Sequence, residues 1–342
     1  MTAQLETREP STAKVARRIL PSPVTGQEWV LGAVLVALWV ILSFTTPAFA
    51  TSGSWQPLLA SVAPVAVMGV GMTAVIITGG IDVSVGGAMM VTGVTTAKML
   101  VDQDVSLPVA VLLAMALGAV LGLVNGLLIA YGHVHAIIIT FGTANVLQFV
   151  GRQIFNSQTV NGIPDTLDFF SRGENGRTLG IPHSFVLTLV IAVLAWIYLR
   201  HMRGGRHLYA IGGDPLAARL AGIRVQRYVV LTYAVTGLLV GLAAVFTIAS
   251  GTSTLDQSIG SGQELAVIAA VVIGGTSITG GRGSVLGTVL GALLVQTVSS
   301  GVTQLGWPSQ LSDFFVGLAI AIAVGADLLR QRTRQQRTGQ QP

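Results

Sequence analysis

The 342-residue chain contains no cysteine, so it can form neither a disulfide framework nor a metal site with cysteine ligands. Charged residues are scarce as well: they make up 10% of the chain, against about 25% in a typical soluble domain. A water-soluble fold of this length would need a polar surface that so few charges cannot cover. Because 51% of the residues are hydrophobic and stand in long runs, we predict an integral membrane protein.

Motifs for nucleotide binding and hydrolysis are also missing. The only two lysines, Lys14 and Lys98, lie outside any G-x-x-x-x-G-K-[ST] context, so the chain has no P-loop, and neither H-E-x-x-H nor G-x-S-x-G occurs. Of the histidines only His133 and His135 are close in sequence, and their spacing directs the two side chains apart on a helix. We therefore predict no cofactor and no metal site. We attribute the net charge of +5 to membrane topology rather than to nucleic-acid binding.

The apolar runs define the expected fold. A helix needs roughly 20 mostly apolar residues to cross a bilayer. Ten segments approach this requirement, although the third, eighth and ninth are short and rich in glycine and the fifth carries polar side chains. They cover residues 29–46, 57–78, 85–100, 107–130, 136–154, 184–201, 228–250, 264–275, 285–300 and 311–329. We predict an all-α integral membrane protein with about ten transmembrane helices.

The basic residues predict the orientation of these helices, because Lys and Arg collect in cytoplasmic loops. They cluster in the N-terminal tail 1–27, in the loop 202–227 after the sixth segment and in the C-terminal tail 331–342. Both termini are therefore predicted to be cytoplasmic, which requires an even number of spans and leaves residues 28–330 as the transmembrane domain. Residues 48–50 (Ala-Phe-Ala) resemble a signal-peptide cleavage site, but cleavage would break this parity, and we expect an uncleaved first span.

Few carboxylates lie in or near the predicted spans, and each is a functional candidate by default. Ser261 and Glu264 match the S-x-x-E capping box at the start of an apolar run. Asp313 falls in the first turn of the last span, where the helix dipole favours an anion, and Asp327 lies near the cytoplasmic end of that span. We expect structural roles for these three carboxylates. Asp82 remains the only candidate for a carboxylate that titrates or binds an ion during transport.

Two glycine-rich stretches interrupt the apolar pattern, at residues 78–87 and 272–283. In the first, Asp82 or Ser84 is placed to cap the next helix. Each stretch joins a span that ends in Gly-Gly to a short span that contains glycine, which suggests a weak internal repeat. Irregular backbone at membrane depth must line a cavity or be buried in protein, so these stretches point to a transport pathway. Close helix packing through small residues is the alternative, and both can hold.

A third stretch, residues 212–223, predicts a short helix with both ends specified. Asp214 is a favoured N-cap residue, and Pro215 suits the first helical position. Gly222 is the expected C-terminal stop. Two turns of helix are not stable alone in water, so this helix in the largest cytoplasmic loop needs a partner surface.

These three stretches resemble the signatures of the ribose-type ABC permeases, the membrane subunits of binding-protein-dependent sugar importers. Residues 212–223 resemble the cytoplasmic loop of that family, residues 79–86 its G-G-I-D-L-S-V-G stretch, and residues 273–283 a third signature. The likeness covers roughly residues 28–330.

In the wider permease superfamily the cytoplasmic helix reads E-A-A-x-x-x-G. Ala217, Ala218 and Gly222 match this pattern, while Leu216 stands where Glu is expected. The departure leaves open which contacts are made with an ATPase.

The resemblance implies a bundle like that of type II ABC importers in the cell inner membrane, which moves a monosaccharide or sugar-like solute. A second permease chain, identical or paralogous, completes the pathway, and an ATP-hydrolysing subunit docks on the helix 215–221. An extracytoplasmic sugar-binding protein delivers the solute, with loops 155–183 and 251–262 as candidate contacts. The implied ATPase-coupling residues are Asp214, Pro215, Ala217, Ala218, Arg219 and Gly222. The implied motif residues near the pathway are Gly79, Gly80, Asp82, Ser84, Gly86, Gly274, Gly275, Gly280 and Gly281.

Polar residues in the spans are candidates for the pathway lining: Asn125, Thr140, Asn145 and Gln148. The alternative role for each of them is to join helices by hydrogen bonds. Two other functions remain open from the residues alone. A gradient-driven secondary transporter would use Asp82, and an intramembrane enzyme would need a second carboxylate facing it. Nothing in the spans distinguishes one sugar from another.

Overall fold

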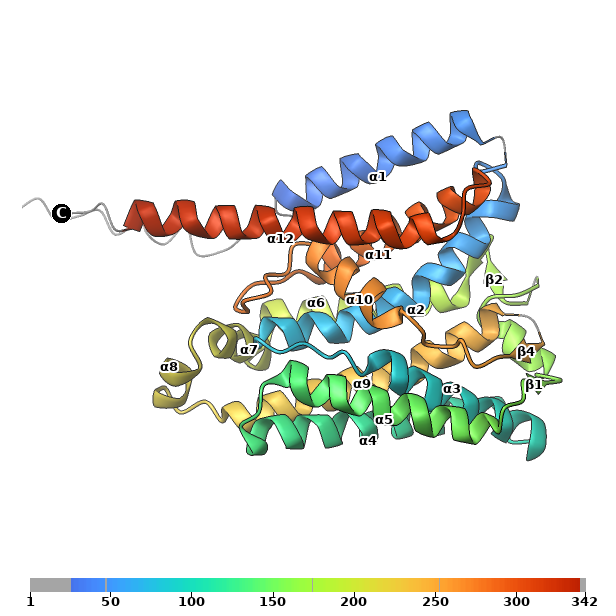
Figure 1. Cartoon of the computed structure of the whole chain (residues 1–342), viewed down its shortest axis with the longest axis horizontal. Helices are drawn as coiled ribbons and strands as arrows, with labels where there is room; N and C mark the ends of the chain where they lie inside the picture. Colours follow the sequence, from blue (N-terminus) through green and yellow to red (C-terminus); the bar gives the residue numbers. More distant parts are fainter. Residues whose placement is uncertain (1–25, 47, 174, 252, 339–342) are drawn as a thin grey trace, which may run out of the picture.

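The computed structural model describes residues 26–46, 48–173, 175–251 and 253–338 (Figure 1). Most of the predicted N-terminal tail, including Lys14, Arg17 and Arg18, lies outside the described residues. The helices are α1 (Gly26–Thr45), α2 (Ser52–Ile77), α3 (Val85–Asp102), α4 (Leu107–Gly132), α5 (Ala136–Phe155), α6 (His183–His201), α7 (Arg203–Gly213), α8 (Pro215–Leu220), α9 (Val225–Ser250), α10 (Gln263–Ile273), α11 (Val285–Gln304) and α12 (Gln310–Thr338).

Each of the ten predicted apolar segments coincides with one of these helices. The largest difference is at the C-terminus, where α12 continues to Thr338, beyond the predicted span. Within the described part of the chain, six helices are long and apolar enough to cross a membrane: α1, α2, α4, α6, α9 and α11. Helix α10 is apolar but has only 11 residues. Helices α7 and α8 lie within the predicted loop 202–227, where the sequence predicts α8 but not α7, and both are short and lie together at one end of the bundle (Figure 1).

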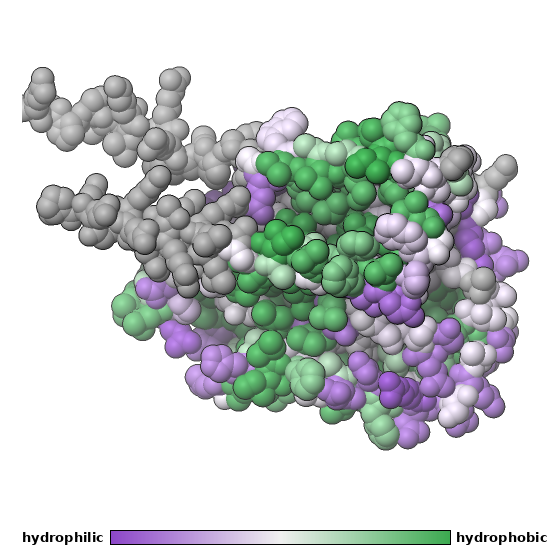
Figure 2. Space-filling model, turned by 45° about the horizontal axis from the view of Figure 1, so that its top comes forward, coloured by the Kyte–Doolittle hydropathy of each residue, from purple (hydrophilic) through white to green (hydrophobic). Residues whose placement is uncertain are grey.

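Helices α2 and α9 form the centre of the bundle, and α1, α4 and α6 lie around it. Most of α2 and α9 is buried, whereas less than a third of the apolar window of α1, α4 or α6 is buried. The outward faces carry large apolar side chains, including Phe44, Leu112 and Leu194. Figure 2 shows such side chains gathered over the face formed by α1 and α12. An apolar surface of this extent is expected where lipid is the solvent.

Glycines bring α4 and α9 into backbone contact over several turns. A Cβ atom added at Gly118 would overlap the Gly237 carbonyl oxygen, and one at Gly237 would overlap that of Gly118. One turn further on, Gly122 lies equally close to the Tyr233 carbonyl. Lipid supplies no hydrophobic drive for helix association, so close packing through small residues takes its place.

Short strands form a cap at the end of the bundle opposite α7 and α8 (Figure 1). β1 (Val160–Asn161) pairs antiparallel with β4 (Thr254–Leu255), and β2 (Arg177–Thr178) pairs with β3 (Ile181–Pro182). A 3₁₀ helix, η2 (Asp165–Phe170), belongs to the same cap. The fold is therefore helical throughout the bundle, with two-residue strands only in this cap among the described residues.

Candidate transport and coupling site

Helix α8 begins and ends where the sequence predicts. The Asp214 carboxylate oxygen Oδ1 accepts hydrogen bonds from the backbone N–H groups of Leu216 (2.9 Å) and Ala217 (3.0 Å), and Pro215 is the first helical residue. Gly222 adopts a left-handed φ of 83°, which ends the helix without steric cost. The prediction of a capped two-turn helix is confirmed.

The outer face of α8 carries two exposed leucines. Ala218 is buried against Ile211 and Val225, which fixes the inner face of the helix. Leu216 and Leu220 are 67% and 83% exposed, and their i,i+4 spacing places them on one face. This short helix therefore presents a small apolar surface at the end of the bundle, away from the apolar flanks.

Three glycine-rich stretches meet where α7 ends, in a contact that we call the glycine junction (Ile77, Gly79, Gly212, Gly280 and Gly281). The Gly281 N–H donates to the Ile77 carbonyl at 2.9 Å. A Cβ atom at Gly212 would overlap that carbonyl, and one at Gly280 would lie 3.0 Å from the Gly212 carbonyl oxygen and 3.1 Å from the Gly79 nitrogen. The junction therefore joins the ends of α2 and α7 and the loop after α10, backbone to backbone.

Tyr209 of α7 adds a side-chain contact beside the junction. Its hydroxyl donates to the Gly283 carbonyl at 3.0 Å. Burial raises the pKa of the Tyr209 hydroxyl, so this group stays protonated and remains a donor at neutral pH. The helix hairpin that carries α8 is thus attached to the loop after α10 by a backbone contact and by a phenol.

The two glycine-rich stretches begin with the same backbone turn, at the ends of α2 and α10, although α8 and α11 also end in this way. Gly80 donates its N–H to the carbonyl five residues earlier at 3.1 Å, and Thr276 does the same at 3.2 Å. Gly79 and Gly275 are left-handed, with φ of 82° and 95°. Both helices therefore end in the same Schellman-type turn. Gly274, the residue before this turn in α10, instead lies against Gly287 of α11.

Asp82 lies in a buried hydrogen-bonded turn rather than on an open surface. Its Oδ1 accepts from the Ser84 N–H (2.9 Å) and from the Ser84 hydroxyl (2.6 Å), and the Asn125 amide donates to that hydroxyl at 2.7 Å. Thr140 donates its hydroxyl to the Ile81 carbonyl at 3.1 Å. The contacts of Asn125 and Thr140 position the segment before α3.

The other two candidate lining residues, Asn145 and Gln148, lie on a more accessible face of α5. Asn145 is exposed, and its amide donates to the Phe141 carbonyl of its own helix at 2.8 Å. Gln148 is partly exposed one turn away. Phe141 and Phe149 are exposed on the same helix. This face of α5 therefore carries amide groups between aromatic rings.

The capping-box prediction for Ser261 and Glu264 is wrong. The N-cap of α10 is Gly262, whose left-handed φ of 72° turns the chain into the helix, and no side chain caps it. Glu264 instead packs against Gly86 of α3, and its Oε2 is buried without a hydrogen-bond partner among the described residues. The prediction for Asp313 in the first turn of the last helix is confirmed. The side chain of Asp327 lies outside the described residues.

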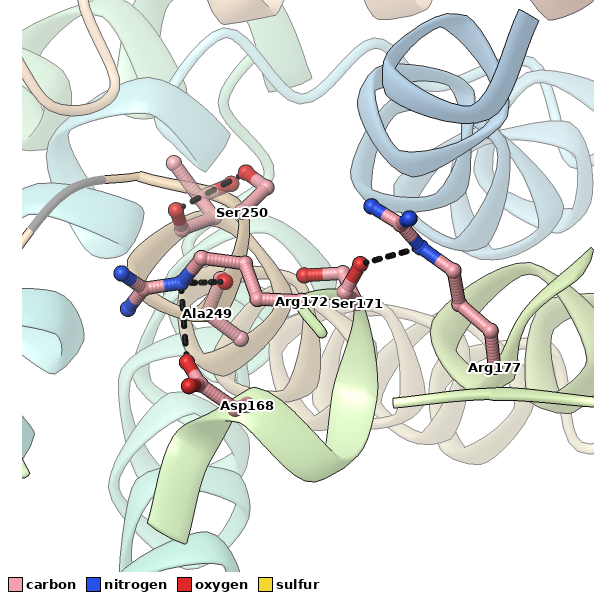
Figure 3. Close-up of polar contacts among 7 residues, drawn as sticks. Asp168, Ser171, Arg172, Arg177, Ala249 and Ser250 are labelled. Carbon is pink, nitrogen blue, oxygen red and sulfur yellow. Dashed lines mark hydrogen bonds and ion pairs between the residues drawn. The ribbon is translucent and has the colours of Figure 1, made fainter. Parts of the chain in front are cut away.

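The strand cap joins the two loops that the sequence marks as external contacts, because β1 and β4 belong to loops 155–183 and 251–262. Two arginines hold this cap, and Figure 3 shows Arg172 bonded to the end of α9 and Arg177 bonded within the cap. Arg172 Nε donates to the Ala249 carbonyl at 2.9 Å and lies 3.0 Å from the Asp168 carboxylate. Arg177 donates to the Ser171 carbonyl at 3.2 Å and to the Gln56 side chain at 2.5 Å.

Comparison with known proteins identifies the family. Residues 56–324 match the family described as branched-chain amino acid transport system / permease component. The ribose import permease of Escherichia coli (strain K12) is 38% identical over 87% of this chain and 92% of its own length. The fructose import permease of Rhizobium meliloti is 31% identical over 90% and 85%, and the D-allose transport permease of Escherichia coli (strain K12) is 30% identical over 87% and 89%.

No solved structure matches the chain. The family match covers the bundle from the first turns of α2 into α12, including the Asp82 turn, the glycine junction and α8. The apolar helices agree with a protein integral to the membrane. The chain belongs to the family of ABC importer permeases that includes the ribose import permeases.

Proposed function

We propose that this chain is the membrane-spanning subunit of an ATP-driven importer for a monosaccharide or a closely related solute in the cell inner membrane. We place residues 28–330 in the transmembrane domain, with ten spans and with both termini in the cytoplasm. The observation that carries the proposal is α8, a capped helix with two exposed leucines that is connected through α7 to the ends of two buried helices.

An ATPase subunit is the partner that we assign to α8. Leu216 and Leu220 face away from the bundle, and burying an exposed leucine contributes about 1.5–3 kcal/mol. The ends of the helix are defined by Asp214, Pro215 and Gly222. Ala218 holds the helix to the bundle, and the residues beside the leucines are Ala217 and Arg219. Because the chain has no P-loop, ATP hydrolysis belongs to a separate chain.

A second permease chain, identical or paralogous, completes the pathway in this proposal. Asn145 and Gln148 are the lining candidates that we retain, because they lie on the accessible face of α5. Asn125 and Thr140 act in positioning instead, since both are buried and hydrogen-bonded to the segment that contains Asp82. Gly274, Gly275, Gly280 and Gly281 then shape the cytoplasmic ends of the helices around the pathway.

We assign the strand cap to an extracytoplasmic binding protein that delivers the solute. The cap lies at the end of the bundle opposite α8, and it combines loops 155–183 and 251–262 in one surface. Its arginines attach it to α2 and α9, so that a partner bound there would act on the helices directly.

A sugar is the cargo that we propose, because the relatives that match most of the chain are named for ribose, fructose and D-allose. The description of the matching family names branched-chain amino acids instead. Uptake of radiolabelled pentoses, hexoses and leucine by proteoliposomes that contain the whole transporter distinguishes the two cargo classes.

The gradient-driven alternative rests on Asp82. One oxygen of this carboxylate is held by two hydrogen bonds from Ser84, and only 2% of the residue is exposed, which favours a fixed turn over a site that an ion must reach. Transport that continues without the ATPase chain, and a proton current that Asp82→Asn abolishes, would support this alternative.

Co-purification tests the ATPase assignment. The chain is expressed with the products of neighbouring genes, and the ATPase activity of the co-eluting material is measured. We expect Leu220→Asp to abolish co-elution of the ATPase. Leu179→Asp is the matched control, because Leu179 is 95% exposed but lies in the strand cap at the far end. If Leu220→Asp retains the ATPase as well as the control does, α8 is not the docking site.

A further inference from the structure

A five-residue turn occurs twice in the chain, in corresponding places. Residues 82–86 read Asp-Val-Ser-Val-Gly, and residues 256–260 read Asp-Gln-Ser-Ile-Gly. In the first, Asp82 Oδ1 accepts from the N–H and hydroxyl of Ser84 at 2.9 and 2.6 Å. In the second, Asp256 Oδ1 accepts from the N–H and hydroxyl of Ser258 at 2.7 and 2.5 Å. The two turns share Asp, Ser and Gly and the hydrogen bonds from Ser to Asp, but Gly86 already belongs to α3 whereas Gly260 is left-handed, with φ of 83°.

Each turn follows one of the two central helices of the bundle, α2 or α9. The first begins after α2 and ends in the first turn of α3, and the second lies between α9 and α10. Helices α2 and α9 pack side by side and run in opposite directions (Figure 1). The second turn is therefore an inverted copy of the first, entered from the other end of the bundle.

The last glycine of one turn touches the last glycine of the other. A Cβ atom at Gly86 would lie 2.5 Å from the Gly260 carbonyl oxygen, and one at Gly260 would overlap the Gly86 carbonyl. We call this contact the glycine crossing. It lies within protein, since both glycines are buried, and the Glu264 carboxylate covers it.

Two segments connect the glycine crossing to the glycine junction. Residues 80–86 lead from the end of α2 to Gly86, and α10 leads from the region of Gly260 back to the loop that contains Gly280 and Gly281. At the α7 side, Gly212 contacts Ile77, three residues before the first segment, and the loop that follows α10. A displacement of Gly212 thus reaches the same contact inside the bundle by two routes.

The two turns differ in how firmly they are held. Asp82 and Ser84 are buried, and Asn125 of α4 ties the first turn to the bundle. Asp256 and Ser258 are exposed in the strand cap. The polar side chains of the first turn are therefore fixed inside the bundle, whereas those of the second turn face outward and only its Ile259 side chain is buried, against Gly93 of α3.

We propose that the glycine crossing is the point at which movement of the α7–α8 hairpin is converted into movement of the turn 256–260 at the external end of the pathway. The inference rests on the proposed docking of an ATPase at α8. In this mechanism the binding and hydrolysis of ATP displace Gly212, α10 follows, and the turn 256–260 shifts over Gly86. The cytoplasmic hairpin is thereby linked to the external cap within one chain.

A thiol at position 257 reports this movement. The chain lacks cysteine, so Gln257→Cys introduces the only thiol of the permease, between the two residues that form the second turn. The complex with its ATPase is reconstituted in nanodiscs, and labelling of the permease by a maleimide is timed with and without nucleotide trapped by vanadate. We expect the labelling rate of the Gln257→Cys variant to change at least threefold on trapping. Leu179→Cys, in the β2–β3 hairpin, serves as a reference thiol that stays unchanged.

Two adjacent glycines of α7, Gly212 and Gly213, provide a test variant and its matched control. Gly212→Ala places a methyl group on the Ile77 carbonyl, whereas Gly213→Ala, one residue later in α7, meets no atom within 4 Å. We expect Gly212→Ala to abolish the nucleotide-dependent change in labelling at position 257 while the ATPase still co-elutes, and Gly213→Ala to preserve it. A role in packing alone would leave labelling insensitive to nucleotide in every variant.

The possible failures are distinct. If the parent chain does not co-elute with an ATPase, the proposed function is overturned. If the complex forms but trapping leaves the labelling rate at position 257 unchanged, or if Gly212→Ala and Gly213→Ala respond alike, the glycine crossing does not transmit the movement. Should Gly212→Ala fail to assemble, Tyr209→Phe replaces it, because this change removes only the hydrogen bond to Gly283 and should reduce the response.

Discussion

The N-cap of α8 offers a graded test of how much ATPase affinity depends on the order of this helix. Asp214→Ala removes the acceptor of two backbone N–H groups, at 2.9 and 3.0 Å, in a helix of only six residues. Loss of an N-cap of this kind costs about 1 kcal/mol. If that energy must be supplied on docking, the affinity for the ATPase falls about fivefold. Asp214→Asn keeps an oxygen acceptor without the charge, so it should retain most of the affinity.

The assay is a titration of fluorescently labelled ATPase subunit onto the permease in nanodiscs, read as a dissociation constant for each variant. A matched control is Asp104→Ala, an exposed aspartate in the connection between α3 and α4. The capping argument is supported if the affinity for the ATPase decreases from the parent to Asp214→Asn to Asp214→Ala, with Asp214→Asn close to the parent. If Asp214→Asn binds the ATPase as weakly as Asp214→Ala, the carboxylate contacts the ATPase directly. If neither variant differs in affinity from the parent, the order of α8 does not limit docking.

Three further predictions concern the bundle and the cap. Gly118→Ala should lower the free energy of unfolding by about 1–3 kcal/mol, seen as a lower melting temperature in detergent, whereas Gly142→Ala, with no atom within 4 Å, should not. Ser84→Ala leaves the buried Asp82 without its hydroxyl donor, and a loss of about 1–3 kcal/mol is expected in the same assay; wild-type stability would refute a structural role for the turn. Arg172→Ala should reduce stimulation of ATP hydrolysis by the binding protein, without loss of the ATPase from the complex, because it detaches the cap from the end of α9.

Much of the helical bundle could be predicted from the sequence because its signals are local. Long apolar runs mark the helices whatever they pack against. The α8 helix was predictable for the same reason, since Asp214, Pro215 and Gly222 specify its ends within nine residues. The Schellman turns of α2 and α10 follow from paired glycines in the same way.

Other features depend on contacts between distant residues. Helix α7 contains Gly204, Gly205, Gly212 and Gly213, a composition that does not favour a helix, and it forms because Leu208 and its neighbours pack on the bundle. The β1–β4 pair joins residues about 95 positions apart, and two-residue strands carry no periodic pattern.

The polar residues predicted to line the pathway show what the sequence does not reveal, namely which side chains are buried. Asn125 and Asn145 look equivalent in sequence, yet one is buried against Ser84 and the other is exposed on α5. Glu264 matched a capping pattern, but the left-handed Gly262 had already turned the chain, which left the carboxylate to pack on Gly86. Which face of a helix is covered is decided by its neighbours, and a single sequence does not state it.

The backbone contacts between α4 and α9 bear on where the transporter can change shape. Where Gly118 meets Gly237, backbone touches backbone, and no side chain lies between the two helices that could change rotamer. We expect α4 and α9 to move as one rigid body through the whole transport cycle, with Asn125 and the Asp82 turn carried on it. The relative motion needed to open the pathway to each side in turn then falls to helices outside this block, such as α10, which packs on α2 and α11.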